Sequence, residues 1–168
     1  MKRGEPYASD PRAGSLRRRN SAKAVVCLDG RILFTVNRDR LGEFLLLPGG
    51  GQRFGETLEE ALVRETLEET GWVVEPGALV LVREYIGGRH EFADEDGDVH
   101  QVEFMFLARA VVRRRGEPGE GDAWQTGVRW LPPGSLPGRR IYPSVLERLL
   151  GSVIDGSYRG PVYLGAVN

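Results

Sequence analysis

The sequence has little sulfur and no long apolar run. Cysteine occurs once, as Cys27, which excludes an internal disulfide. Cys27 lies in the apolar run from Ala24 to Leu28, so we expect it to serve as a small buried hydrophobic residue. No window approaches the roughly 18 uninterrupted apolar residues that a membrane span needs, and the first twenty residues lack the apolar centre of a signal peptide. We therefore expect a cytoplasmic protein with no membrane partner.

An excess of charge of one sign is also absent over the whole chain. The 168 residues include 23 basic and 24 acidic side chains, so the total gives no argument for a nucleic-acid partner. The distribution is less even, because residues 1–19 carry six basic residues against two acidic ones (Lys2, Arg3, Arg12, Arg17, Arg18 and Arg19 against Glu5 and Asp10). We expect residues 1–20 to form a basic arm, either solvated or contacting phosphate or RNA, and residues 21–168 to form a single domain.

Short extended segments dominate the rest of the chain. Residues 23–28 and 31–36 flank Asp29-Gly30 and predict a β-hairpin. Further strands are expected at 44–47, 79–86, 102–112 and 128–131. Pro143 is well placed to open a helix that runs through Leu146, Leu149, Leu150 and Val153. The pattern predicts an α+β or mixed-sheet domain with few helices.

The best-marked helix is expected from Thr57 to Thr70. It begins with Thr57-x-x-Glu60, the spacing of a capping box, and it ends at Gly71. At about 100° per residue, Glu65, Glu68 and Glu69 share one face. Such like charges at i,i+3 and i,i+4 cost about 0.2–0.5 kcal/mol each, and the helix dipole disfavours acidic residues in the last turn. The face is therefore either a solvated acidic stripe or a site for a hard divalent cation.

The segment Leu47-Pro48-Gly49-Gly50-Gly51 comes shortly before this helix. Three glycines allow the backbone to approach a ligand closely and to direct amide and carbonyl groups into a cleft. This feature favours the metal site over the acidic stripe. We expect Gly49, Gly50 and Gly51 to contact substrate.

The two segments together resemble the Nudix box, the loop–helix–loop signature of the Nudix hydrolases. The chain reads Gly50-x5-Glu56-x7-Arg64-Glu65-Thr66-x-Glu68-Glu69-x-Gly71-Trp72, and every charged and glycine position of that signature is filled. Thr66 departs from the usual aliphatic residue, and its hydroxyl needs a partner or water. The order of flanking elements extends the resemblance from Ala22 to about Asp155. It implies the Nudix α/β/α sandwich, a mixed β-sheet between helices.

The resemblance also implies roles for the residues of the box. Glu65, Glu68 and Glu69, with the carbonyl of Gly50, would ligate Mg²⁺, or Mn²⁺ in its place. Arg64 would pair with Glu68 and fix its rotamer, and Glu56 would support the site. The catalytic set would comprise Arg64 and Glu68 with a general base.

The general base is the point at which the sequence departs from MutT-like members of the family. These members often carry a glutamate six residues before a tryptophan of a late strand. Trp130 resembles that tryptophan, and the residue six positions before it is Trp124 instead of a glutamate. Glu120 and Asp122 in the same loop, a glutamate of the box, or Glu103 on a strand could serve instead. Trp124 would either stack on a nucleobase or cover the core.

The resemblance implies a Mg²⁺-dependent pyrophosphohydrolase that cleaves a nucleoside diphosphate linked to another group. The substrate would be a small nucleotide of the nucleoside triphosphate, ADP-ribose or nucleotide sugar type, and the enzyme could form a homodimer. The alternative is a non-catalytic Nudix-fold regulator that binds a nucleotide or nucleic acid. The complete set of Arg64, Glu65, Glu68 and Glu69 favours the enzyme, because a sensor does not need it.

Overall fold

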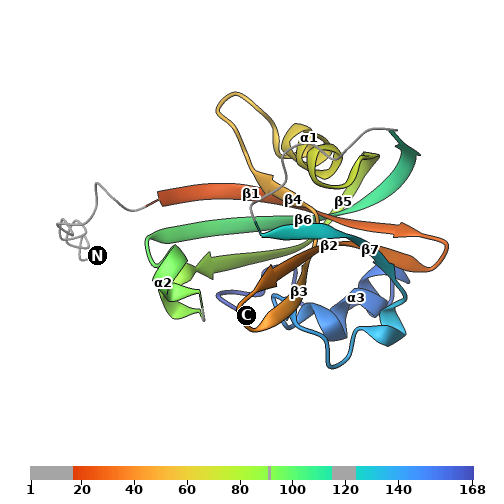
Figure 1. Cartoon of the computed structure of the whole chain (residues 1–168). Coiled ribbons are helices and arrows are strands. Elements are labelled where there is room, and N and C mark those ends of the chain that lie inside the picture. Colours follow the sequence, from red (N-terminus) through yellow and green to blue (C-terminus); the bar gives the residue numbers. More distant parts are fainter. Residues whose placement is uncertain (1–16, 91, 115–123) are drawn as a thin grey trace, which may run out of the picture.

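The computed structural model describes residues 17–90, 92–114 and 124–168, and these form one mixed β-sheet with helices on both faces (Figure 1). Within these ranges the strands are β1 (Arg17–Leu28), β2 (Arg31–Asp39), β3 (Gly42–Leu46), β4 (Gly49–Gly51), β5 (Trp72–Ile86), β6 (Val99–Arg113), β7 (Gln125–Leu131) and β8 (Ile141–Tyr142). The α-helices are α1 (Leu58–Thr70), α2 (Ala93–Asp96) and α3 (Leu146–Ile154). Two short 3-10 helices, η1 (Gly87–Arg89) and η2 (Pro133–Ser135), complete the elements.

The strands follow the order β5-β6-β1-β2-β3-β8, with β4 paired to β1 and β7 paired to β2. The pairs β1–β6 and β3–β8 are parallel, and the other pairs are antiparallel. The predicted hairpin is confirmed, because Cys27 pairs with Ile32 and Leu28 pairs with Arg31. Cys27 is half-buried rather than buried.

Alternate residues of the central strands supply two hydrophobic cores, one on each face of the sheet. Ala22, Ala24 and Val26 of β1 pack with Ala61 and Leu62 of α1. On the opposite face, Val25 of β1 and Met105 of β6 belong to the same core as Leu146, Leu150 and Val153 of α3. Figure 1 shows α1 and α3 on opposite sides of the sheet. The expected α/β/α sandwich is therefore confirmed.

Strand β1 begins earlier than predicted. Arg17–Asn20 pair in parallel with Val99–Val102, and Arg17 Nε lies 2.9 Å from Asp98 Oδ2. The assignment of these four residues to an arm was wrong, because β6 extends far enough to offer them a hydrogen-bonding edge. Residues 1–16 of the predicted arm lie outside the described residues.

Two further boundaries differ from the prediction. The expected strand from Leu79 begins at Trp72 as β5, and Pro76-Gly77 interrupts its register without ending it. An edge strand tolerates proline, and β5 is the last strand on its side of the sheet path. Helix α3 begins at Leu146, and Pro143 instead starts the preceding turn, where its carbonyl accepts a hydrogen bond from Leu146 N.

Candidate active site

The glycine run forms strand β4 and lies against the middle of β1. Gly49, Gly50 and Gly51 pair with Lys23, Ala22 and Ser21, an edge of β1 that β2 leaves free because it pairs only at the hairpin end. Gly49 has a φ of +129°, and a Cβ built there would lie 2.1 Å from the Ala22 carbonyl oxygen. Only glycine allows this approach. The resemblance implied a loop before the helix, whereas Gly49–Gly51 form a strand whose close backbone approach is to β1.

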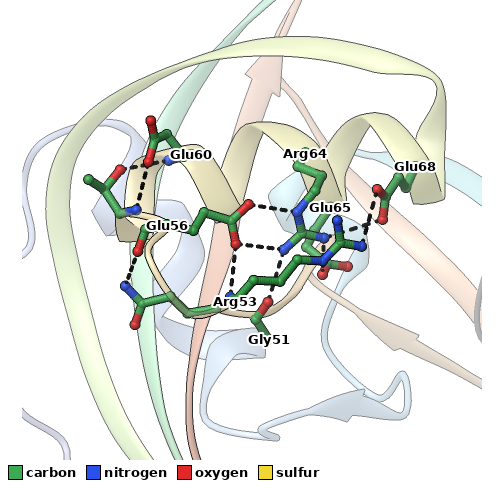
Figure 2. Close-up of polar contacts among 9 residues, drawn as sticks. Gly51, Arg53, Glu56, Glu60, Arg64, Glu65 and Glu68 are labelled. Carbon is green, nitrogen blue, oxygen red and sulfur yellow. Dashed lines mark hydrogen bonds and ion pairs between the residues drawn. The ribbon is translucent and has the colours of Figure 1, made fainter.

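Helix α1 has the predicted ends. Thr57 accepts a hydrogen bond from Glu60 N at 3.1 Å, and Thr57 N donates to Glu60 Oε2 at 2.7 Å, which completes the capping box (Figure 2). Gly71 adopts the left-handed conformation with a φ of 74°, and its N–H donates to the Leu67 carbonyl. Both ends of the helix are thus fixed, and so is the position of the acidic face.

Arg64 connects the helix to the preceding loop (Figure 2). Its Nε and Nη2 donate to the two oxygens of Glu56 at 2.7 and 2.9 Å, and Nη2 also donates to the Gly51 carbonyl at 3.0 Å. Nη1 donates to Glu65 at 2.5 Å and to Glu68 at 3.3 Å. The predicted contact with Glu68 is present, but the carboxylate that Arg64 binds in a bidentate way is that of Glu56.

The Arg64–Glu56 pair perturbs both groups electrostatically. Hydrogen bonding from Arg64, with a further bond from Arg53 N, lowers the pKa of Glu56 to about 2. The same Glu56 contact, together with Glu65, raises the pKa of Arg64 above its ordinary value. The pair therefore stays fully charged across the physiological range and holds the loop onto the helix.

The three carboxylates of the acidic face each contact a different part of this loop or its neighbours. A Cβ on Gly50 would lie 2.5 Å from Glu65 Oε2, so the absent side chain leaves room for that carboxylate. Glu69 Oε2 accepts a hydrogen bond from Gly49 N at 2.9 Å, and Glu68 Oε1 lies 3.7 Å from Arg53 Nη2. In the described ranges, no three acidic, histidine or cysteine side chains already converge as a metal site. The donors are nevertheless oxygens, which hard cations prefer.

Gln125 connects the start of β7 to the last turn of α1, and Trp124 precedes it beside β2. Gln125 Nε2 donates to the Glu69 carbonyl at 2.7 Å, and the Trp124 carbonyl accepts from Arg38 N at 3.0 Å. The Trp124 residue is 54% exposed, so it does not cover the core. The base candidates Glu120 and Asp122 lie outside the described residues.

Glu103 occupies a buried ion pair. It shares the sheet face of Met105, and its Oε2 accepts from Arg83 Nε at 2.6 Å. Burial would raise the pKa of Glu103, but the charge of Arg83, aided by Lys23 and Gln101, holds it below its ordinary value. This carboxylate is engaged structurally, which argues against its prediction as a general base.

Sequence reasoning missed Lys23 and Arg53. Lys23 Nζ donates to the Gly49 carbonyl, and its charge also acts on Glu103, so it links the glycine run to the buried ion pair. A lysine at a core-facing position of a strand was the available signal for Lys23. The contact of Arg53 with Glu68 has no comparable signal, because it depends on how the loop folds back.

The hydroxyl of Thr66 lacks the partner that the sequence required. Thr66 is fully buried, and its Oγ1 has no hydrogen-bond partner in the part of the chain that the structure describes. Its carbonyl, in contrast, accepts from Thr70 Oγ1 at 2.5 Å. Thr66 therefore fills an aliphatic position at an energetic cost.

The fold and the site together define a class: an α/β/α domain whose glycine strand and acidic helix are joined by an arginine–glutamate pair. Comparison with known proteins agrees with this class. The NUDIX domain model matches residues 17–149, and the chain belongs to the Nudix family. The match begins at the first residue of β1.

Curated relatives carry names related to mutators and oxidised nucleotides. A protein of Mycobacterium tuberculosis named "Putative mutator protein MutT4" is 32% identical over 159 residues, which are 86% of this chain and 59% of that protein. The human 8-oxo-dGDP phosphatase is 36% identical over 91 residues, 54% of this chain and 24% of that protein. The chain thus spans less than two thirds of the length of these relatives.

Solved structures share the fold at lower identity. A NUDIX hydrolase from Nitrosomonas europaea has a TM-score of 0.66 at 19% identity, covering 87% of this chain and 94% of that one. A MutT NUDIX hydrolase from Burkholderia pseudomallei has a TM-score of 0.59 at 24% identity, covering 78% and 95%. These likenesses extend over most of the sheet and its helices.

Proposed function

We propose that the protein is a Mg²⁺-dependent pyrophosphohydrolase that cleaves a nucleoside diphosphate linked to another group. The observation that carries this proposal is the network of Arg64, which ties Glu56 and the Gly51 carbonyl to Glu65 and Glu68 on one helical face. A regulator that only bound nucleotides would not need three carboxylates that repel one another on one helical face. No feature of the described residues favours that alternative.

Glu65, Glu68 and Glu69, with the carbonyl of Gly50, would hold the cation. The room that Gly50 leaves beside Glu65, and the bond from Gly49 N to Glu69, place carboxylate oxygens next to backbone groups of β4. When bound, Mg²⁺, or Mn²⁺, neutralises the diphosphate and lowers the pKa of a coordinated water. Because Glu65 and Glu69 already have partners, we expect at least one carboxylate to turn when the cation enters.

The other residues would bind and orient the nucleotide. Gly49, Gly50 and Gly51 would present backbone groups to the phosphates, and the exposed Trp124 would stack on the base. Glu120 or Asp122 would accept the proton of the attacking water. Arg64 would act as a positioning residue for Glu68 and Glu65.

The substrate class is a small nucleotide of the nucleoside triphosphate, ADP-ribose or nucleotide sugar type. Two relatives are named for 8-oxo-dGDP and 8-oxo-dGTP, which supports including oxidised deoxynucleotides. In the described ranges, no helix is both long and apolar enough to cross a membrane. A cytoplasmic location and a homodimer stay predictions.

A hydrolysis screen tests the proposal. The purified chain is incubated with Mg²⁺ and nucleoside triphosphates, oxidised deoxynucleotides, ADP-ribose, nucleotide sugars and dinucleoside polyphosphates, and the products are separated by chromatography. We expect a nucleoside monophosphate from at least one compound, and no turnover after chelation with EDTA. Lack of cleavage of every compound by a correctly folded protein would overturn the proposal.

A second experiment addresses the base. If Glu120 or Asp122 takes the proton, then Glu120→Gln or Asp122→Asn lowers kcat by about 10²-fold or more. Only one of the two changes should have this effect. A loss of less than about threefold for both would move the base to the box or to a metal-bound hydroxide.

A further inference from the structure

A groove of about 450 Å³ lies beside the loop that leads into α1. Its lining includes Arg18, Arg19, Gln52, Arg53, Phe54 and His100. It stands on the α1 side of the sheet, since Asn20 and Val102, which also line it, precede Ala22 and Phe104 at two-residue spacing along β1 and β6. The roles proposed above use none of its six named residues.

The fold holds two walls of this groove together. Arg18 pairs with His100 in the parallel β1–β6 ladder, in the part of β1 that the sequence had assigned to an arm. Gln52 N donates to the Asn20 carbonyl at 3.0 Å, and Asn20 Nδ2 donates to Gln52 Oε1 at 3.0 Å. These two bonds pin the loop to the strand, so Arg53 and Phe54 project from a fixed base.

The charge of the groove is only partly neutralised. The side chain of Arg18 is exposed, and it has no hydrogen bond or ion pair with another side chain among the residues that the structure describes. The side chain of Arg53 is 66% exposed, and its one ion pair within the described part of the chain is with Glu68, at 3.7 Å. Arg19 and His100 are engaged, with Gln101 and Glu84 respectively. Two guanidinium groups are thus available to an anion.

Phe54 adds an aromatic surface to this charge. It is fully exposed and belongs to neither hydrophobic core. Its ring faces are open to stacking, and aromatic rings beside guanidinium groups bind bases together with their phosphates. The combination favours a nucleotide over a simple anion.

The position of the groove connects it with the candidate active site. Arg53 contacts both the groove and Glu68, and Gln52 directly follows Gly51, whose carbonyl accepts from Arg64. A ligand in the groove therefore lies at one end of the acidic face.

We propose that this groove binds a second nucleotide unit of the substrate, attached beyond the diphosphate that is cleaved. Arg18 and Arg53 contact its phosphate and Phe54 stacks on its base. The volume is within the usual range for small-molecule sites. The inference rests on the proposed function, and the second unit could come from a dinucleoside polyphosphate or from the 5′ end of an RNA.

Matched kinetics test this inference. kcat/KM is measured for diadenosine tetraphosphate, a short 5′-triphosphorylated RNA and ATP, with wild type, Arg18→Gln, Phe54→Ser and the control Arg31→Gln. Arg31 is also exposed, but it lies in the β1–β2 hairpin away from the groove. We expect Arg18→Gln and Phe54→Ser to lower kcat/KM for an extended substrate roughly tenfold more than for ATP. The extended substrate with the larger loss of kcat/KM is the one that the groove binds. Arg31→Gln should leave kcat/KM unchanged for all three substrates.

Calorimetry in EDTA provides a readout that does not depend on turnover. Diadenosine tetraphosphate and the RNA should bind wild type and Arg31→Gln alike, and bind Arg18→Gln with a roughly tenfold larger Kd. Equal affinities in all variants, with equal ratios of kcat/KM for the extended substrates to kcat/KM for ATP, would overturn the proposed role of the groove. Hydrolysis of ATP in the same experiment would leave the proposed function unaffected. If no anhydride is cleaved, the proposed function fails, and the calorimetry still decides the groove.

Discussion

At the residue scale, Arg64 organises the candidate site. Its planar guanidinium donates to Glu56, Gly51, Glu65 and Glu68 at once, which a lysine ammonium cannot do in the same geometry. Arg64 thereby reduces the repulsion among the carboxylates of α1. It also sets the distance between the glycine strand and the helix.

The catalytic role of the carboxylates should be separable from their effect on stability. Glu68→Gln and Glu69→Gln each remove a proposed cation ligand and also relieve like-charge repulsion within α1. We expect kcat to fall by orders of magnitude while the melting temperature stays the same or rises. Turnover is measured at saturating Mg²⁺ on the best substrate, and near-normal rates in both variants would remove the metal assignment.

Thr66 gives a prediction about stability alone. Replacing its unpaired buried hydroxyl by a methyl group, in Thr66→Val, should stabilise the fold by about 1 kcal/mol. Thr70→Val is the matched control, because the Thr70 hydroxyl donates to the Thr66 carbonyl and its loss should destabilise. Urea denaturation measures the change in the free energy of unfolding for each variant. Changes of the same sign in both variants would contradict this account of the two hydroxyls.

Glu56 makes stability depend on pH. Its pKa is lowered from 4.5 to about 2, chiefly by Arg64, so the folded state favours the ionised form. The resulting stabilisation is complete above pH 4.5 and is lost as the pH falls through about 2. We therefore expect the stability gap between wild type and Glu56→Gln to be largest near pH 7 and to shrink below pH 4.5. A gap that stays constant from pH 7 to pH 3 would argue against the pair.

At the element scale, the early start of β1 has a measurable consequence. A truncation that begins at Arg17 keeps the whole parallel ladder with β6, whereas one that begins at Ser21 removes four paired residues and the Arg17–Asp98 contact. We expect the second truncation to unfold at a temperature several degrees lower, because it loses the ladder hydrogen bonds of these four residues. Calorimetric scans of both decide this, and equal transitions would contradict the role of Arg17–Asn20.

The same elements show what local sequence signals can and cannot predict. The ends of α1 followed from Thr57, Glu60 and Gly71, because caps depend on neighbours within one turn. The start of β1 did not, since a row of arginines becomes a strand only when a distant partner supplies the edge. The start of β5 at Trp72, seven residues before the predicted strand, did not follow either, because only the sheet order shows that β5 is an edge strand that tolerates Pro76.

At the scale of the whole molecule, the fold and the box residues were predictable, but their partners were not. Spacing alone placed Glu65, Glu68 and Glu69 on one face of α1. The pairing of Arg64 with Glu56, the link from Lys23 to the Gly49 carbonyl and the groove around Phe54 depend on contacts between segments that spacing does not encode.

The central claim is that this Nudix domain uses Mg²⁺ and its own carboxylates to direct water onto phosphorus. Hydrolysis of the best substrate in ¹⁸O-labelled water, followed by mass spectrometry of the phosphorylated products, tests it most directly. The account predicts one ¹⁸O atom per cleavage on a product phosphate, at a rate that needs Mg²⁺ and falls by orders of magnitude in Glu68→Gln. Label-free phosphate products, or a rate indifferent to both EDTA and Glu68→Gln, would contradict it.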